Sequence, residues 1–205
     1  MISWLGWSFK TAPANIDESI RPGEQPLEHV RRLALEKCHV EIASAQPGEI
    51  VIAADTIVVL DDSILGKPLD EQDAFVMLKS LRNRTHQVIT AITLRQVGAS
   101  ETLRDYCVSN VKMRDYTDPE IETYIMSGDP LDKAGGYAIQ NAAFHPVIDF
   151  TGCFAGVMGM PLCHLERTLR RMAGYQPADL AAICQNNLDY ACPIIRRVMA
   201  GENIG

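Results

Sequence analysis

The stretch Ile50-Val-Ile-Ala-Ala-Asp-Thr-Ile-Val-Val-Leu60 decides the fold of this chain. It is rich in β-branched residues and almost wholly apolar, which is typical of a buried central strand. Because the side chains of a strand alternate between its faces, Asp55 shares a face with apolar residues while Thr56 points to the other face. If the strand ends at this point instead, both side chains can line one cleft.

Asp55 is the residue in this strand that needs a physical explanation. An ionised carboxylate among apolar side chains costs several kcal/mol unless it meets a cation, a metal or hydrogen-bond donors. Buried acids with shifted pKa values gather at functional sites, which makes Asp55 a candidate. The alternative is a structural aspartate that accepts hydrogen bonds from backbone amides at a bend.

The segment before this strand predicts a helix from Leu27 to about Ala43. Its apolar residues follow a spacing of three and four: Val30, Leu33, Ala34 and Cys38. Lys37 falls on or beside the same apolar face, so its long side chain either reaches out to solvent or points into a site.

The segments after the strand predict a mixture of strands and helices. Asp70 is a suitable N-cap for a helix through Leu81, and the capping-box pattern of residues 117–120 opens another to Met126. Further expected elements are strands at 86–94 and 103–113, more strand at 142–157, and helices at 161–172, 179–184 and 193–199. This order predicts an α/β protein with a mixed sheet.

Composition limits the classes of function. The chain has 205 residues, 47% of them hydrophobic, and a net charge of −7. Such an acidic protein is a poor general binder of nucleic-acid polymers, which need clustered Lys and Arg. No apolar run reaches the ~20 residues that span a membrane, and the N-terminus lacks the pattern of a signal peptide, so we expect a cytoplasmic protein.

The six cysteines form no C-x-x-C pair and match no disulfide framework, so free, mostly buried thiols are expected. The adjacent pair Cys163-His164 is only weak evidence of a metal site, because no second pair of ligands accompanies it.

Two further segments carry groups that suit an anionic ligand. Lys67 lies between Gly66 and Pro68, where an ammonium can reach a phosphate or can simply be solvated. The glycine-rich stretch Gly128 to Gln140 lets backbone amides approach a ligand closely, and it includes Asp132 and Lys133. Gln140 offers a donor and an acceptor together, which suits reading the edge of a base. An ordinary loop is the alternative for this stretch.

Taken together, the chain resembles the Maf-like nucleotide pyrophosphatases, once called septum-formation proteins. The resemblance rests on short motifs in family order: Ile16-Asp-Glu-Ser19, Arg32-Leu-Ala-Leu-Glu-Lys37, Ala54-Asp-Thr-Ile-Val-Val59, Ile64-Leu-Gly-Lys-Pro68, Thr85-His-Gln-Val88, the stretch 129–140, and Gly159-Met-Pro-Leu162. It implies an elongated sheet flanked by helices in two lobes with a cleft between them. A homodimer is also possible by resemblance.

The family hydrolyses a nucleoside triphosphate to the monophosphate and pyrophosphate with a divalent metal, Mg²⁺ or Mn²⁺. By resemblance, Asp55 occupies the position of the proton acceptor, and Glu18, Lys37 and Lys67 match other active-site positions. The resemblance also implies a metal held by Glu18 and Asp55. Substrate contacts are then expected from four residues: Thr56, Gln140, Asp132 and Lys133. The Asp-Thr and Ile-Gln pairings resemble the subgroup that acts on dTTP and UTP, with modified pyrimidine nucleotides as further candidates.

Two parts of the chain depart from this pattern. Family members carry an N-terminal strand and a Ser-x-Ser-Pro-Arg-Arg loop that binds phosphate, and no such sequence occurs here. A misassigned start, a truncated inactive chain, or replacement of the missing cations by another segment would each explain this, and we favour the first. A catalytically impaired nucleotide-binding or regulatory protein is the alternative function. A chain without that strand is expected to expose a sheet edge.

The expected organisation is a Maf-like domain at residues 1–175 and a helical extension at 176–205. Residues 176–205 extend beyond the family pattern. They are expected to form either a packed helix pair or a surface that binds a partner.

Overall fold

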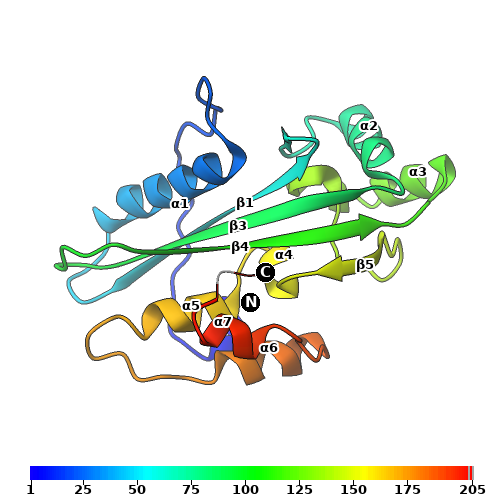
Figure 1. Ribbon diagram of the computed structural model, residues 1–205. Coiled ribbons are helices and arrows are strands. Elements are labelled where there is room, and N and C mark those ends of the chain that lie inside the picture. The colour runs from blue at the N-terminus through cyan, green and yellow to red at the C-terminus, as the bar shows by residue number, and fades with distance from the viewer. Residues whose placement is uncertain (203, 205) are drawn as a thin grey trace.

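The computed structural model describes residues 1–202 and residue 204. Its centre is a five-stranded sheet with the order β2-β1-β3-β4-β5 (Figure 1). The strands are β1 Ile50–Leu60, β2 Ser63–Leu65, β3 Thr85–Gln96, β4 Leu103–Met113 and β5 Val147–Thr151. The predicted α/β class and central strand are confirmed.

Every pairing between neighbouring strands is antiparallel, so within the described residues the sheet is not of the mixed type that was expected. Two of these pairings, β1 with β2 and β3 with β4, follow from short connections, because hairpins join antiparallel neighbours. Asp61 and Asp62, for example, turn the chain from β1 into β2 with positive φ angles of 49° and 63°.

Helices flank the sheet on both faces and at one end (Figure 1). They are α1 Pro26–Ile42, α2 Glu71–Leu81, α3 Asp118–Met126, α4 Phe154–Val157, α5 Leu162–Leu169, α6 Leu180–Leu188 and α7 Ile195–Met199. The predicted caps start two of them: Asp70 accepts from the amide of Asp73 at 2.8 Å, and Thr117 forms a capping box with Glu120. These local signals therefore located α2 and α3 correctly.

One expected strand is only partly a strand. The stretch 142–157 contains β5, but its end forms the short helix α4 rather than a strand. Gly156 explains the difference, because a Cβ there would lie 2.5 Å from Sγ of Cys107. The bare glycine lets α4 pack directly onto β4, and Cys153 caps the helix by accepting from the Gly156 amide at 3.3 Å. A short apolar run cannot by itself distinguish a strand from a helix of this kind.

The apolar core divides into clusters that define two lobes. On one face of β1, Ile57 and Val59 pack against α1. On the other face, Ile52 and Ala54 join the cluster beneath the C-terminal helices, whereas Val58 joins the cluster formed with α2 and α3. Residue 56 thus lies where the two clusters separate, and the sequence-adjacent position 55 faces α1.

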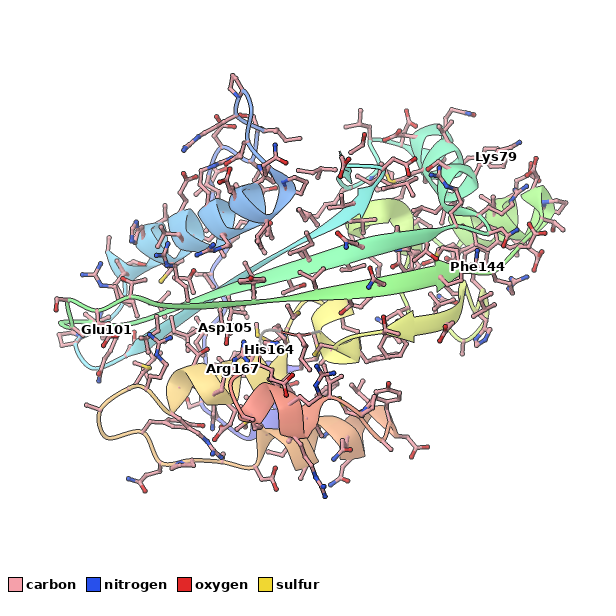
Figure 2. All side chains as sticks on the ribbon, in the orientation of Figure 1. Lys79, Glu101, Asp105, Phe144, His164 and Arg167 are labelled. Atoms are coloured by element: carbon pink, nitrogen blue, oxygen red, sulfur yellow. The ribbon has the colours of Figure 1, made fainter. Side chains whose placement is uncertain are left out.

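The C-terminal segment packs onto the rest of the chain. Leu180 of α6 and Val198 of α7 are fully buried, and both helices contact α5. Arg167 of α5 binds Asp105 of β4 with an Nη2–Oδ1 distance of 2.6 Å, and it donates to the carbonyl of Val198 at 3.1 Å (Figure 2). The helices α6 and α7 are therefore packed against α5.

The cysteines are free thiols, as expected. The side chain of His164 lies close to those of Cys107 and Cys153. Cys163, its neighbour in the sequence, is not part of this group. Among the described residues, none of the helices combines the length and apolarity required to cross a membrane.

One edge of the sheet is only briefly covered. β2 pairs with β1 at Val58, Val59 and Leu60. Along residues 50–57, the described part of the chain places no strand on that side of β1.

Candidate active site

A cavity of about 280 Å³ opens where the two lobes separate. Six of the residues predicted for the site line it: Asp55, Thr56, Lys67, Asp132, Lys133 and Gln140. They come from β1, from the turn after β2, and from the loop that follows α3. The sheet therefore brings together segments that lie far apart in the sequence. Although β1 continues to Leu60, both Asp55 and Thr56 line this cavity.

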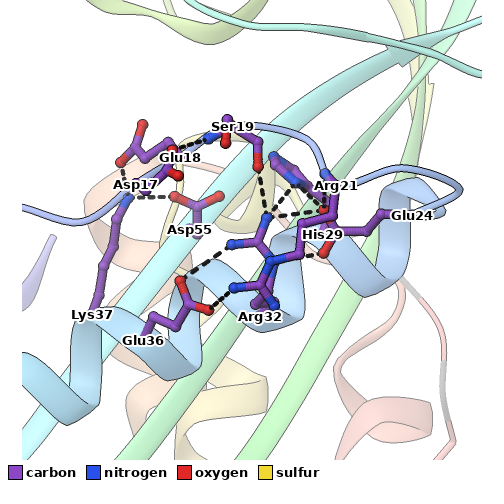
Figure 3. Close-up of polar contacts among 10 residues, drawn as sticks. All are labelled: Asp17, Glu18, Ser19, Arg21, Glu24, His29, Arg32, Glu36, Lys37 and Asp55. Carbon is purple, nitrogen blue, oxygen red and sulfur yellow. Dashed lines mark hydrogen bonds and ion pairs between the residues drawn. The ribbon is translucent and has the colours of Figure 1, made fainter.

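The two remaining predicted residues lie on the α1 side of Asp55, where Lys37 contacts both Asp55 and Glu18 (Figure 3). Lys37 lies on the inward face of α1, and its Nζ is 2.5 Å from Oδ1 of Asp55. The same Nζ is 2.7 Å from Oε1 of Glu18, which lies in the loop that precedes the helix. The side chain of Asp55 is only 10% exposed, compared with 54% for Glu18. Lys37 thus lies between a buried and a half-exposed carboxylate.

The environment shifts the pKa of each member of this trio. Burial raises the pKa of Asp55 above its ordinary value, and the hydrogen bond from Lys37 only partly opposes that effect. Burial lowers the pKa of Lys37, but its bonds to Asp55 and Glu18 outweigh burial and the pKa is raised. The hydrogen bond from Lys37 lowers the pKa of Glu18. Asp55 is consequently the more basic carboxylate, next to a lysine that stays charged.

Thr56 lies on the opposite face of β1 and bonds to a residue that sequence reasoning missed. Its Oγ1 is 2.8 Å from Oγ1 of Thr90 in β3, and Thr90 donates to the carbonyl of Gly156 at 2.7 Å. Thr90 is fully buried. A signal was present, because Thr90 is a polar residue inside an apolar strand, which is the same argument that singled out Asp55.

The loop between α3 and β5 forms one wall of the cavity. Gly135 has a φ of +73°, and a Cβ there would lie 2.8 Å from Cγ2 of Val58, so the loop backbone packs directly on β1. Tyr137 bonds to the buried His86 of β3 with an OH–Nε2 distance of 2.7 Å. His86 belonged to a quoted motif, but nothing in the sequence indicated its contact with Tyr137.

The charged residues of this loop differ in how they are held. Lys133 contacts Oδ1 of Asp132 at 2.6 Å and donates to the carbonyl of Asp129 at 2.8 Å. Asp132 and Gln140 are exposed beside the cavity. Lys133 is therefore tied to its own loop, while Gln140 remains accessible to a ligand.

Lys67 is exposed in the turn after β2 and lies near enough to Glu18 to help lower the pKa of that carboxyl group. Within residues 1–202 and 204, no ion pair engages it. A positive charge at the cavity wall is thus open to an anionic ligand.

Glu24, a second acidic residue near the first turn, does not join Asp55. Arg32 contacts it through Nε at 2.6 Å, and Nδ1 of His29 lies 2.9 Å away (Figure 3). The hydrogen bond from Arg32 lowers the pKa of Glu24. Arg32 also donates to the carbonyl of Ser19 at 2.9 Å, so this cluster fixes the loop that carries Glu18.

Comparison with known proteins finds a matching family and several relatives of this chain. A family model described as "Maf-like protein" matches residues 1–172. A dTTP/UTP pyrophosphatase of Clostridioides difficile (strain 630) is 42% identical over 163 residues, which is 80% of this chain and 84% of the relative. Proteins of the same name from Syntrophomonas wolfei and Dictyoglomus turgidum are 39% and 38% identical, over 83% and 85% of this chain and 90% of each relative.

Proposed function

This chain belongs to the Maf-like protein family, and from that premise we propose that it hydrolyses dTTP or UTP to the monophosphate and pyrophosphate. Relatives that carry the name dTTP/UTP pyrophosphatase match most of the chain at 37% to 42% identity. The observation that carries the proposal is the buried Asp55, which contacts Lys37 at 2.5 Å and lines the cavity beside Thr56. Modified pyrimidine triphosphates belong to the same substrate class.

In the proposed reaction, Asp55 accepts a proton from a water molecule. The water oxygen forms a bond to the α-phosphorus, and the bond from that phosphorus to the oxygen bridging to the β-phosphorus breaks. Pyrophosphate then leaves with the electron pair of the broken bond. The raised pKa of Asp55 suits a general base, because a more basic carboxylate removes a proton from water more readily.

The cationic side chains have separate proposed roles. Lys37 holds Asp55 in place through its 2.5 Å contact and keeps a positive charge beside it. Lys67, exposed at the cavity wall, stabilises negative charge on the triphosphate. Asp132 and Lys133 line the same cavity, and we propose that they contact the substrate as well.

A divalent cation fits the carboxylates of this site. Asp55 and Glu18 each contact Lys37 through one oxygen, Oδ1 and Oε1 respectively, and so each has a second oxygen that Lys37 does not take. Carboxylate oxygens together with substrate phosphates are the ligands that Mg²⁺ prefers, and Mn²⁺ shares this preference. Bound there, such an ion would offset the negative charge of the phosphates.

The test is a nucleotide panel with product analysis. The protein is incubated with dTTP, UTP, CTP, dATP and GTP in Mg²⁺, in Mn²⁺ or in excess chelator, and the monophosphate and pyrophosphate are quantified by chromatography. We expect turnover of dTTP and UTP at about 1 s⁻¹ or faster, and loss of this turnover in excess chelator. Binding of these nucleotides without any turnover would contradict the proposal and favour a regulatory protein.

A further inference from the structure

Two threonine hydroxyl groups connect the cavity to the backbone of α4. Thr56 lines the cavity, and its Oγ1 lies 2.8 Å from Oγ1 of the fully buried Thr90. Thr90 Oγ1 lies 2.7 Å from the carbonyl oxygen of Gly156. These three groups form a hydroxyl chain, Thr56–Thr90–Gly156, that crosses from β1 to β3 and then to α4.

The carbonyl group of Gly156 determines which hydroxyl group donates in each of these hydrogen bonds. A carbonyl oxygen can only accept, so Thr90 must donate its single hydroxyl proton to Gly156. The short contact between the two threonines then needs a proton from Thr56, because Thr90 has no second one to give. Thr56 therefore directs its proton away from the cavity and presents only lone pairs toward a ligand.

We propose that Thr90 is a positioning residue that makes Thr56 a hydrogen-bond acceptor and thereby selects a base that carries a ring N–H. The inference rests on the proposed function and specifies its substrate class. The imide edge of uracil and thymine has an N–H donor between two carbonyl groups, whereas cytosine has an acceptor at the same ring position. A Thr56 hydroxyl group that can only accept forms a hydrogen bond with the ring N–H of uracil or thymine. The same group repels the ring acceptor of cytosine, because both atoms present lone pairs.

The surroundings of Thr56 leave its acceptor side open. A Cβ placed on Gly159 would lie 3.5 Å from Oγ1 of Thr56, and Gly159 has a φ of +96° that side chains rarely adopt. Gln140 lines the same cavity and is exposed, so its amide N–H can donate to one of the carbonyl groups that flank the ring N–H. The cavity thus offers an acceptor and a donor to the imide edge.

The test compares selectivity in three variants of β3. Thr90→Val keeps the shape of the side chain but removes the acceptor for the Thr56 proton, so Thr56 can rotate and donate to cytosine. Thr90→Ser keeps the hydroxyl group. Thr93→Val is the matched control, since Thr93 is a buried threonine of the same strand that does not line the cavity.

The measured quantity is the ratio of kcat/KM for UTP to kcat/KM for CTP. We expect this ratio to fall about tenfold in Thr90→Val and to stay at the wild-type value in Thr90→Ser and Thr93→Val. A structural loosening would lower both kcat/KM values together and leave the ratio unchanged, and that result would overturn the inference. A wild-type enzyme that accepts 3-methyl-UTP, which lacks the ring N–H, as well as UTP would also overturn it.

A binding measurement separates this inference from the proposed function. If the wild-type chain turns over no nucleotide, the proposed function fails, and calorimetric titration with UMP and CMP still tests the selectivity. Tighter binding of UMP that depends on the Thr90 hydroxyl supports the inference. Equal affinity for UMP and CMP in the wild type contradicts it.

Discussion

Lys37 Nζ lies 2.5 Å from Oδ1 of Asp55, so an ion pair joins helix α1 to the central strand β1 beside the cavity. The pair is only partly desolvated, with side chains that are 20% and 10% exposed. Burial makes Asp55 more basic, while the ammonium group favours its ionised form. Burial is the larger of the two effects, so the pKa of Asp55 is raised.

Asp55→Asn should remove the proposed base while leaving the fold intact. The amide has nearly the same shape and its oxygen can still accept from Lys37, so we expect little change in melting temperature. Turnover should fall about 100-fold or more, which is the scale of general-base catalysis. The measurements are kcat on dTTP and thermal unfolding. Asp62→Asn is the control, because Asp62 is exposed in the turn after β1, and a near-normal rate for Asp55→Asn would remove Asp55 from the mechanism.

His86 should make stability depend on pH between about 6.5 and 4. Burial lowers its pKa from 6.5 to about 4, so below pH 6.5 the unfolded chain binds a proton that the folded protein excludes. The folded state should lose about 2 to 3 kcal/mol from this residue between pH 7 and pH 4.5.

Urea unfolding at the two pH values measures that loss. Glutamine at position 86 can keep the hydrogen bond to Tyr137 and does not titrate. The free energy of unfolding should therefore fall less between the two pH values in His86→Gln than in the wild type, and the difference should equal the contribution of His86. The exposed His39→Gln should behave like the wild type. Equal losses in all three proteins would show that His86 is protonated in the folded state.

Gly135→Ala should destabilise the protein more than Gly128→Ala. Both glycines have nearly the same φ, +73° and +74°, so both variants pay the same backbone strain. Only at position 135 would the new Cβ meet a neighbour, at 2.8 Å from Cγ2 of Val58. We expect the free energy of unfolding to fall by about 1 kcal/mol for Gly128→Ala and roughly 2 to 3 kcal/mol for Gly135→Ala.

The same pair of variants tests the cavity wall. KM for dTTP should rise in Gly135→Ala, because the loop that carries Gln140 is displaced, and should stay near the wild-type value in Gly128→Ala. Identical effects of the two substitutions would mean that the contact with Val58 does not position this loop.

Glu24→Gln should weaken the cluster that fixes the start of α1. The side chain of Glu24 is 8% exposed and accepts charged hydrogen bonds from Arg32, so its loss should lower the free energy of unfolding by roughly 2 kcal/mol at pH 7. Because the folded pKa of Glu24 is lowered, this contribution is present above its ordinary value of 4.5 and is lost as pH falls toward the folded pKa.

Chemical denaturation at pH 7 and at pH 3.5 checks both statements, with the exposed Glu122→Gln as control. The difference in the free energy of unfolding between the wild type and Glu24→Gln should be smaller at pH 3.5 than at pH 7. A gap that is independent of pH would show that the charge of Glu24 contributes nothing.

Much of the fold followed from local signals. The apolar run of β1 and the caps at Asp70 and Thr117 predicted three elements close to their observed bounds. Asp55 was identified as a polar residue in that run, and motif order connected it with Lys37 and Glu18.

Contacts that depend on strand register could not be read in the same way. Thr90 meets Thr56 because β1 and β3 pair with those residues opposite each other, 34 positions apart in the sequence. His86 and Tyr137 are separated by 51 positions and meet only because the loop at Gly135 packs on β1. Contacts of this kind form only when the whole sheet is assembled, so no local sequence pattern predicts them.

The alternation of β1 has a consequence for redesign. Asp55 and Thr56 are consecutive residues, yet Asp55 contacts α1 while Thr56 bonds to Thr90 on the opposite face of the sheet. Substitutions on the Thr56 side leave Lys37 and Glu18 in place, and substitutions on the α1 side leave the two threonines in place. The residues proposed to select the nucleobase and those proposed to hydrolyse the substrate can therefore be varied separately, although a single peptide unit joins the two sets.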